Sequence, residues 1–232
     1  DGALITNMRT GAQTAVALKY LLGLKDGERR PIHLGIYGAG MQGHMQTRAI
    51  STLFDIEELR IYDVSRAALE RFREDMQSAI PGRIILCDDP KDAAQGDAVI
   101  CVTQSKDGFL KEEWLSPETI VFPMGSYQEC EDDVLLHADK IVVDHVEQTL
   151  HRGALSKLAA EGKITRESIT CTIGELVAGR AELHREPAQR IVCLPIGTGA
   201  MDIGCASVVY QRALEQKRGQ FLDFGVSSAT EW

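Results

Sequence analysis

The sequence predicts an α/β fold built on a doubly wound parallel sheet. Short apolar segments alternate with segments of helical spacing along most of the chain. Strands this apolar are typical of a parallel sheet that helices cover on both faces. A glycine-rich turn also joins the first of these strands to the helix that follows it, as in a Rossmann-type dinucleotide-binding domain.

Composition and charge exclude several classes of protein. A chain of 232 residues with 44% hydrophobic residues can bury a substantial core, in one large domain or two smaller ones. The net charge of −9 leaves no basic stripe for nucleic acid, and no apolar run reaches the roughly 18 residues that span a membrane. The six cysteines are scattered without a C-x-x-C pair, so we expect no metal site and free thiols in a reducing cytoplasm.

The first helix is expected to run from Gly11 to Leu22. Residues 10–13 fit the capping-box pattern T-x-x-Q, and Gly23 is a natural stop. Arg9 would then stand at the first turn, where the positive end of the helix dipole gives a cation no stabilisation. Arg9 is therefore either a solvated side chain or one that is held there to meet an anion.

Strands and helices alternate through the rest of the chain. The expected strands are Ile32–Gly38, Leu59–Asp63, Arg83–Cys87, Asp97–Thr103, Thr119–Gly125, Lys140–Asp144 and Arg190–Pro195. The expected helices span Met41–Leu53, follow a cap at Ser65, begin at Pro90, span Val146–Glu161, and end at Gly179. A last helix would turn inward Ile203, Ala206, Val209 or Tyr210, and Ala213.

The glycine-rich turn reads G-A-G-M-Q-G, which is the pattern G-x-G-x-x-G. It lies between the first strand and its helix, where glycines allow a tight turn and a pyrophosphate can bind the amides of the helix N-terminus. A glycine turn without a ligand is the alternative. The residues expected to hold the cofactor here are Gly38, Gly40, Met41, Gln42 and Gly43.

Asp63 stands twenty residues after Gly43, at the end of the second strand. A carboxylate there can accept hydrogen bonds from ribose hydroxyls and repels a 2′-phosphate, which favours NAD over NADP. Arg66 could reverse this preference by pairing with a phosphate, so NADP stays open.

Polar residues follow the fourth and fifth strands. In a doubly wound sheet the ligand lies across the carboxyl ends of the strands, so these residues should border the nicotinamide. Ordinary loop polarity is the alternative for each of them. The candidates are Thr103, Ser105, Gly125 and Ser126.

The order of four segments resembles the ornithine cyclodeaminase/mu-crystallin family. They are MRTGAQTAVALKYL, GIYGAGMQGHMQTRAI, MGSYQECEDDVLLHADKIVVD and IGTGAMDIGCASVVYQRAL, and the resemblance extends from Ile5 to Leu214. The segment KIVVDHVEQTLHRGALSKLAAEGKI is also similar to the branch of N-(2-amino-2-carboxyethyl)-glutamate dehydrogenases.

The resemblance implies a domain organisation, a reaction class and two site residues. Residues 24–197 would form the NAD(P)-binding domain, and residues 1–23 and 198–232 would be remnants of a domain that holds the substrate and forms a homodimer. Members transfer a hydride between the nicotinamide and the α-carbon of a small amino acid or its imine. The resemblance places Arg9 on the substrate carboxylate. Asp202 matches a family aspartate near the nicotinamide, although a helix N-cap is an equal alternative.

Two departures from the family pattern leave alternatives open. Members carry a longer N-terminal segment that supplies a lysine and an arginine, so the chain looks like the C-terminal two-thirds of a member. A catalytic aspartate of cyclodeaminases corresponds here to Tyr127, which is either a proton donor or a packed or surface tyrosine. This favours a dehydrogenase or imine reductase over an ammonia-releasing cyclodeaminase with catalytic NAD. A non-catalytic NAD(P)-binding protein of the mu-crystallin type is the third candidate.

An acidic run follows Tyr127. It is interpreted as a solvated helix start, because carboxylates suit the positive end of a helix dipole. The run comprises Glu129, Glu131, Asp132 and Asp133.

Overall fold

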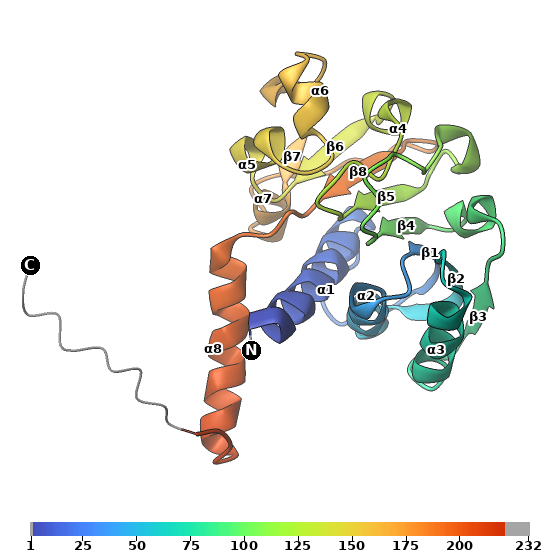
Figure 1. Cartoon of the computed structure of the whole chain (residues 1–232). Coiled ribbons are helices and arrows are strands. Elements are labelled where there is room, and N and C mark those ends of the chain that lie inside the picture. The colour runs from blue at the N-terminus through green and yellow to red at the C-terminus, as the bar shows by residue number, and fades with distance from the viewer. Residues whose placement is uncertain (1, 221–232) are drawn as a thin grey trace, which may run out of the picture.

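A computed structural model describes residues 2–220, and in this range it holds one fully parallel sheet with helices on both faces (Figure 1). The order of the strands is β3-β2-β1-β4-β5-β8-β6-β7. The strands are β1 (Pro31–Tyr37), β2 (Asp55–Tyr62), β3 (Arg83–Leu86), β4 (Ala98–Cys101), β5 (Ile120–Pro123), β6 (Lys140–Val143), β7 (Cys171–Thr172) and β8 (Ile191–Leu194). The predicted fold class, a doubly wound α/β sheet, is confirmed.

Helix α1 precedes the first strand and α8 follows the last, while the other helices and the 3₁₀ turns lie in the connections between strands. The α-helices are α1 (Gly2–Leu21), α2 (Met41–Ser51), α3 (Arg66–Met76), α4 (Asp132–Leu136), α5 (Val146–His151), α6 (Ser156–Ala160), α7 (Ile173–Val177) and α8 (Gly199–Glu215). The 3₁₀ turns are Pro90–Ala94, Glu112–Trp114 and Arg166–Ser168. The predicted cap at Ser65 is confirmed, because its side chain accepts a hydrogen bond from the Ala68 N–H at 3.3 Å.

The sheet separates two apolar clusters. Every residue of β4 is buried; Ala98 and Ile100 belong to the cluster beneath α1, α2 and α3, and Val99 and Cys101 belong to the other. This alternation explains the continuous apolar runs in the sequence, since each face of a central strand meets a covered layer.

The first helix begins at Gly2, so the predicted start at Gly11 and the capping box are wrong. The Thr10 hydroxyl donates to the carbonyl oxygen of Thr6 one turn earlier, at 2.7 Å, and does not cap the helix. Gly11 serves instead for packing, because a Cβ there would come within 2.5 Å of the backbone oxygen of Met45 on α2. Arg9 therefore lies within the helix, and the dipole argument about its first turn does not apply.

The predicted helix over Val146–Glu161 is interrupted. It divides into α5 and α6 because Gly153 adopts a φ of +79°, which ends one helix before Ser156 begins the next. The inward face expected for the last helix is also wrong, since Ile203 is 71% exposed and Tyr210 is 56% exposed. Strand β2 begins at Asp55, four residues before the predicted start at Leu59.

Among residues 2–220, no helix combines the length and the apolar character needed to cross a bilayer. In Figure 1, α8 stands away from the sheet beside the N-terminal end of α1, while the C-terminal half of α1 lies over the sheet. That half supplies Ala15, Leu18 and Leu21 to the core.

Candidate active site

The glycine-rich turn has the form that a pyrophosphate requires. Gly38 has a φ of +106°, and a side chain on Gly43 would collide with the Gly38 carbonyl oxygen. Gly40 precedes α2, and no side chain caps this helix. A Cβ on Gly40 would meet no atom within 4 Å, so the approach to the helix N-terminus is open. The uncapped N–H groups of the first turn therefore suit an anion.

Asp63 connects the end of β2 to this turn. Its Oδ2 accepts a hydrogen bond from the Ala39 N–H, and its Oδ1 accepts one from the Ser65 N–H, both at 2.8 Å. The carboxylate therefore has a fixed orientation. Beside it lies a cleft of about 580 Å³ whose lining includes Gly38, Gly40, Asp63, Thr103 and Ser105.

Arg66 pairs with two carboxylates. Its Nε lies 3.1 Å from Glu70 Oε1, and its Nη1 lies 2.9 Å from Asp88 Oδ1. A 2′-phosphate would compete with these partners, so the argument for NADP from this side chain is weakened.

Glu129 joins the ends of β4 and β5, and its interpretation as part of a solvated acidic run is wrong. The side chain is fully buried. Its Oε1 accepts hydrogen bonds from the N–H and the hydroxyl of Thr103, both at 2.6 Å, and its Oε2 accepts one from the Gly125 N–H at 2.7 Å. Burial raises the pKa of Glu129, and these hydrogen bonds oppose the rise. No pattern in the sequence separates this glutamate from the acidic residues that follow it.

Arg9 meets Asp202, so the structure brings together two of the predicted catalytic residues. The Arg9 Nε lies 3.0 Å from Asp202 Oδ1, and the side chain of Arg9 is only 13% exposed. Its two Nη atoms donate to no residue in the range 2–220. They lie against Gly197, where a side chain would collide with Nη1. Arg9 thus has an anion partner and still presents two free donor atoms.

Gly197 is held in place from the other side by Asp144. The Gly197 N–H donates to Asp144 Oδ2 at 2.5 Å, and the same oxygen accepts a hydrogen bond from Gln13 Nε2 at 2.9 Å. Gly197 has a φ of +90°, which favours glycine. The loop after β8 therefore reaches Arg9 in a fixed conformation.

The remaining predicted residues have different surroundings. Gln42 turns its side-chain amide toward α1, where Nε2 donates to Asn7 Oδ1 at 2.7 Å, and Met41 is exposed. Tyr127 is half exposed, and Lys106 Nζ lies 5.8 Å from the centre of its ring. Tyr127 does not line the cleft beside Asp63.

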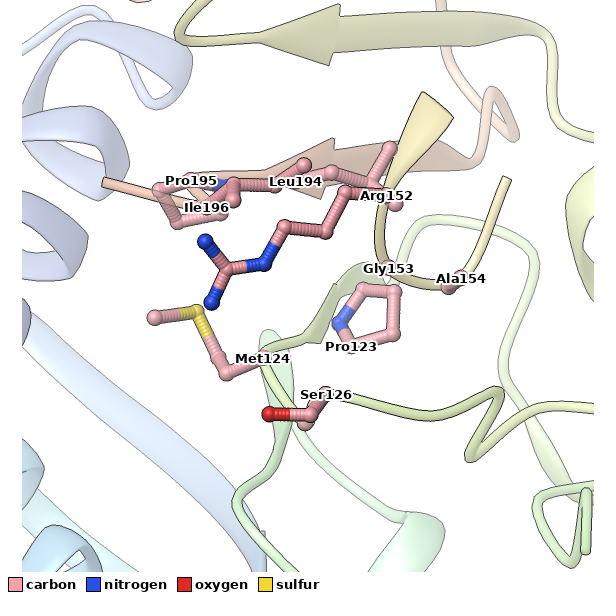
Figure 2. Close-up of a pocket in the computed structure, with 10 residues that line it drawn as sticks. Pro123, Met124, Ser126, Arg152, Gly153, Ala154, Leu194, Pro195 and Ile196 are labelled. Atoms are coloured by element: carbon pink, nitrogen blue, oxygen red, sulfur yellow. The ribbon is translucent and has the colours of Figure 1, made fainter. Parts of the chain in front are cut away.

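Gly125 and Ser126 line a second, smaller pocket of about 40 Å³ between the ends of β5 and β8 (Figure 2). Arg152, from the turn after α5, reaches into this pocket together with Pro195 and Ile196. Arg152 was not among the residues predicted from the sequence; its position directly before Gly153 was the available signal. In the described residues no group of three or more histidine, cysteine, aspartate or glutamate side chains could hold a metal ion.

The strand order, the glycine-rich turn after β1 and the aspartate at the end of β2 define a protein of the dinucleotide-binding Rossmann class. The chain belongs to the ornithine cyclodeaminase/mu-crystallin family, whose model matches residues 1–217. The resemblance noted from the sequence is therefore confirmed.

Three relatives illustrate the match. N-((2S)-2-amino-2-carboxyethyl)-L-glutamate dehydrogenase of Staphylococcus aureus is 30% identical over 96% of this chain and 66% of its own length. Δ1-pyrroline-2-carboxylate reductase of Thermococcus litoralis, solved with NADH and L-proline, has a TM-score of 0.84 and 27% identity over 95% of this chain and 68% of its own.

An archaeal alanine dehydrogenase dimer with bound NAD has a TM-score of 0.80 and 30% identity, over 94% of this chain and 67% of its own. The chain thus spans about two thirds of the length of the relatives it matches.

Proposed function

We propose that this chain is an NAD-dependent oxidoreductase that transfers a hydride between the nicotinamide and the α-carbon of a small amino acid or its imine. The observation that carries the proposal is the Arg9 guanidinium, with two free Nη atoms, in a molecule that also offers an uncapped helix N-terminus after a glycine-rich turn. A guanidinium suits a carboxylate, and the helix N-terminus suits a pyrophosphate. The dehydrogenases and reductases among the relatives support the same reaction class.

The residues of the glycine-rich turn and of the neighbouring strand ends would hold the cofactor. The backbone of residues 38–43 would bind the pyrophosphate, and Asp63 would face the adenosine ribose. Thr103, Ser105, Gly125 and Ser126 would border the nicotinamide. We propose NAD in preference to NADP because Arg66 is already paired with Glu70 and Asp88.

The chain's own residues would bind and orient the substrate. Arg9 would pair with the substrate carboxylate through its free Nη atoms, and Asp202 would hold Arg9 through its Nε. When bound, the nicotinamide supplies the group that accepts or donates the hydride. Holding the two reactants together supplies much of the rate. A role for Tyr127 as proton donor stays a prediction.

We also propose that residues 1–23 and 198–232 belong to a substrate and dimerisation domain, and that residues 24–197 form the cofactor domain. Residue 1 and residues 221–232 of these ranges lie outside the described residues. The exposed apolar side chains of α1 and α8 support a homodimer, as in the alanine dehydrogenase relative. The six free cysteines support a reducing compartment such as the cytoplasm.

The test follows oxidation of NADH in the presence of pyruvate with ammonia, or of a cyclic imino acid. We expect turnover, and we expect Arg9→Ala to raise KM for the amino- or imino-acid substrate by about 10- to 100-fold, since a charge-assisted pair is lost. Arg9→Lys keeps the charge but loses the planar fork, so its KM should lie between those of the wild type and of Arg9→Ala. The dissociation constant of NADH should stay unchanged in both variants.

Other outcomes would favour the rival functions. Conversion of ornithine to proline with catalytic NAD would favour a cyclodeaminase. Tight binding of NADH without any reaction would favour a non-catalytic binding protein. An unchanged KM and kcat in Arg9→Ala would remove the role assigned to that side chain.

A further inference from the structure

Two guanidinium groups flank the short loop that follows β8. Arg9 lies against Gly197 at the end of this loop. Arg152 approaches the loop from α5 and lines a pocket together with Pro195 and Ile196 (Figure 2). The loop is therefore bordered by two arginines: Arg9, whose Nε is paired with Asp202, and Arg152.

Arg152 forms no hydrogen bond and no ion pair with any residue in the range 2–220. Its backbone is extended, with φ −146° and ψ 148°, directly after the last residue of α5. Figure 2 shows the side chain lying along Leu194–Ile196, with its guanidinium toward Met124. Stabilisation of the C-terminus of α5 would require this group to turn back to the helix carbonyls, and it makes no such hydrogen bond.

The pocket matches one small anion in size and chemistry. A volume of about 40 Å³ holds about three water-sized groups, which is the number of heavy atoms in a carboxylate. None of the ten lining residues is acidic. Ser126 lines the same pocket as Arg152, and its hydroxyl forms no hydrogen bond with another described residue. An arginine and a hydroxyl without partners are donors for a carboxylate.

We propose that Arg152 binds a second carboxylate of the substrate, so that the enzyme acts on a dicarboxylic amino or imino acid. This inference rests on the proposed function, in which Arg9 takes the α-carboxylate. Arg152 then determines specificity, because a substrate with an apolar or short side chain leaves it solvated and gains nothing from it.

The first experiment compares two substrate classes with NADH and ammonia. Oxaloacetate and 2-oxoglutarate present a second carboxylate, and pyruvate does not. We expect Arg152→Ala to raise KM for the two dicarboxylic acids by about 10- to 100-fold and to leave KM for pyruvate unchanged. The KM of Arg152→Lys for the dicarboxylic acids should lie between those of the wild type and of Arg152→Ala. Arg71→Ala, which removes an exposed arginine on α3, is the control with the same change of charge and should alter neither KM.

A second experiment measures binding without turnover. Succinate should raise the Tm of the NADH-bound chain more than acetate does, and this difference should disappear in Arg152→Ala. Equal effects of Arg152→Ala on both substrate classes, or no effect on either, would overturn the inference. Equal stabilisation by succinate and inorganic phosphate would also overturn it, because the pocket would then be a general anion site.

The two proposals fail in different ways. Turnover of amino or imino acids that is insensitive to Arg152 leaves the proposed function standing and refutes the second carboxylate. Arg152-dependent binding of succinate in a chain with no turnover refutes the proposed oxidoreductase and supports the pocket.

Discussion

At the scale of single residues, three carboxylates organise the loops around the site, and one of them, Glu129, is buried. Asp63 holds the glycine-rich turn, Asp144 holds Gly197, and Glu129 holds Thr103 and Gly125. Each accepts at least one hydrogen bond from a backbone N–H group, so each fixes the course of a loop. Charge-assisted hydrogen bonds of this kind are stronger than neutral ones.

Glu129→Gln should destabilise the chain by about 1–3 kcal/mol, because one carboxylate oxygen becomes an NH₂ group that cannot accept a hydrogen bond. Either Thr103 or Gly125 would then lose its acceptor in a partly buried place. Urea denaturation measures the loss. The apparent affinity for NADH should fall as well, since both loops border the predicted nicotinamide site. A variant as stable as the wild type would contradict the role given to this side chain.

The same glutamate predicts a pH dependence. Its pKa in the folded chain is raised by burial, so the folded state binds a proton more tightly than the unfolded state. The stabilisation from this difference is fully present below the ordinary pKa of 4.5 and is lost as the pH rises toward the folded value. The stability advantage of the wild type over Glu129→Gln should therefore shrink as the pH rises above 4.5. An advantage that grows with pH would mean that hydrogen bonding outweighs burial.

At the scale of elements, the contact between α1 and α2 depends on Gly11. Gly11→Ala would place a Cβ 2.5 Å from the Met45 carbonyl oxygen, which is backbone and cannot move aside. We expect a loss of about 1–3 kcal/mol, as for other overpacked sites. Gly174→Ala is the matched control on α7, where the nearest atom would lie 3.9 Å away. That control should be neutral or stabilising by up to about 1 kcal/mol. Equal Tm values for the two variants would contradict the close contact.

The sequence predicts the elements whose signals are local. Apolar runs locate the central strands, Ser65 caps its helix, and the glycine-rich turn joins β1 to α2 as expected. The errors arise where tertiary contacts decide. Thr10 matches the sequence pattern of a cap, but the turn before it is already helical. Glu129 has the sequence surroundings of a solvated residue, but Thr103 and Gly125 donate hydrogen bonds to its carboxylate. The same holds for the site, since no spacing in the sequence relates Arg9 to Asp202 or Arg152 to Ser126.

At the scale of the molecule, α8 and the first half of α1 stand out from the sheet and its covering helices (Figure 1). In the described chain α8 has no buried residue, and its principal helical neighbour is α1. Large apolar side chains are exposed on both helices, among them Leu4, Met8, Ile203, Val208, Tyr210 and Leu214. Exposed apolar side chains gathered on two neighbouring helices are typical of an interaction site. These exposed side chains fit a surface that a second copy of the chain covers, as in the proposed homodimer, better than a surface that stays in contact with water.

The double variant Ile203→Glu, Tyr210→Glu should convert a dimer into a monomer, because it places two carboxylates in the contact surface. Sedimentation velocity over a range of protein concentrations measures the change. Val177→Glu is the control, since Val177 is 46% exposed on α7, outside the two helices that carry the surface. The Tm of the dimer should rise with protein concentration, while that of the double variant should not. A wild-type chain that stays monomeric at every concentration would contradict the proposal. A double variant that still dimerises would move the interface away from α8.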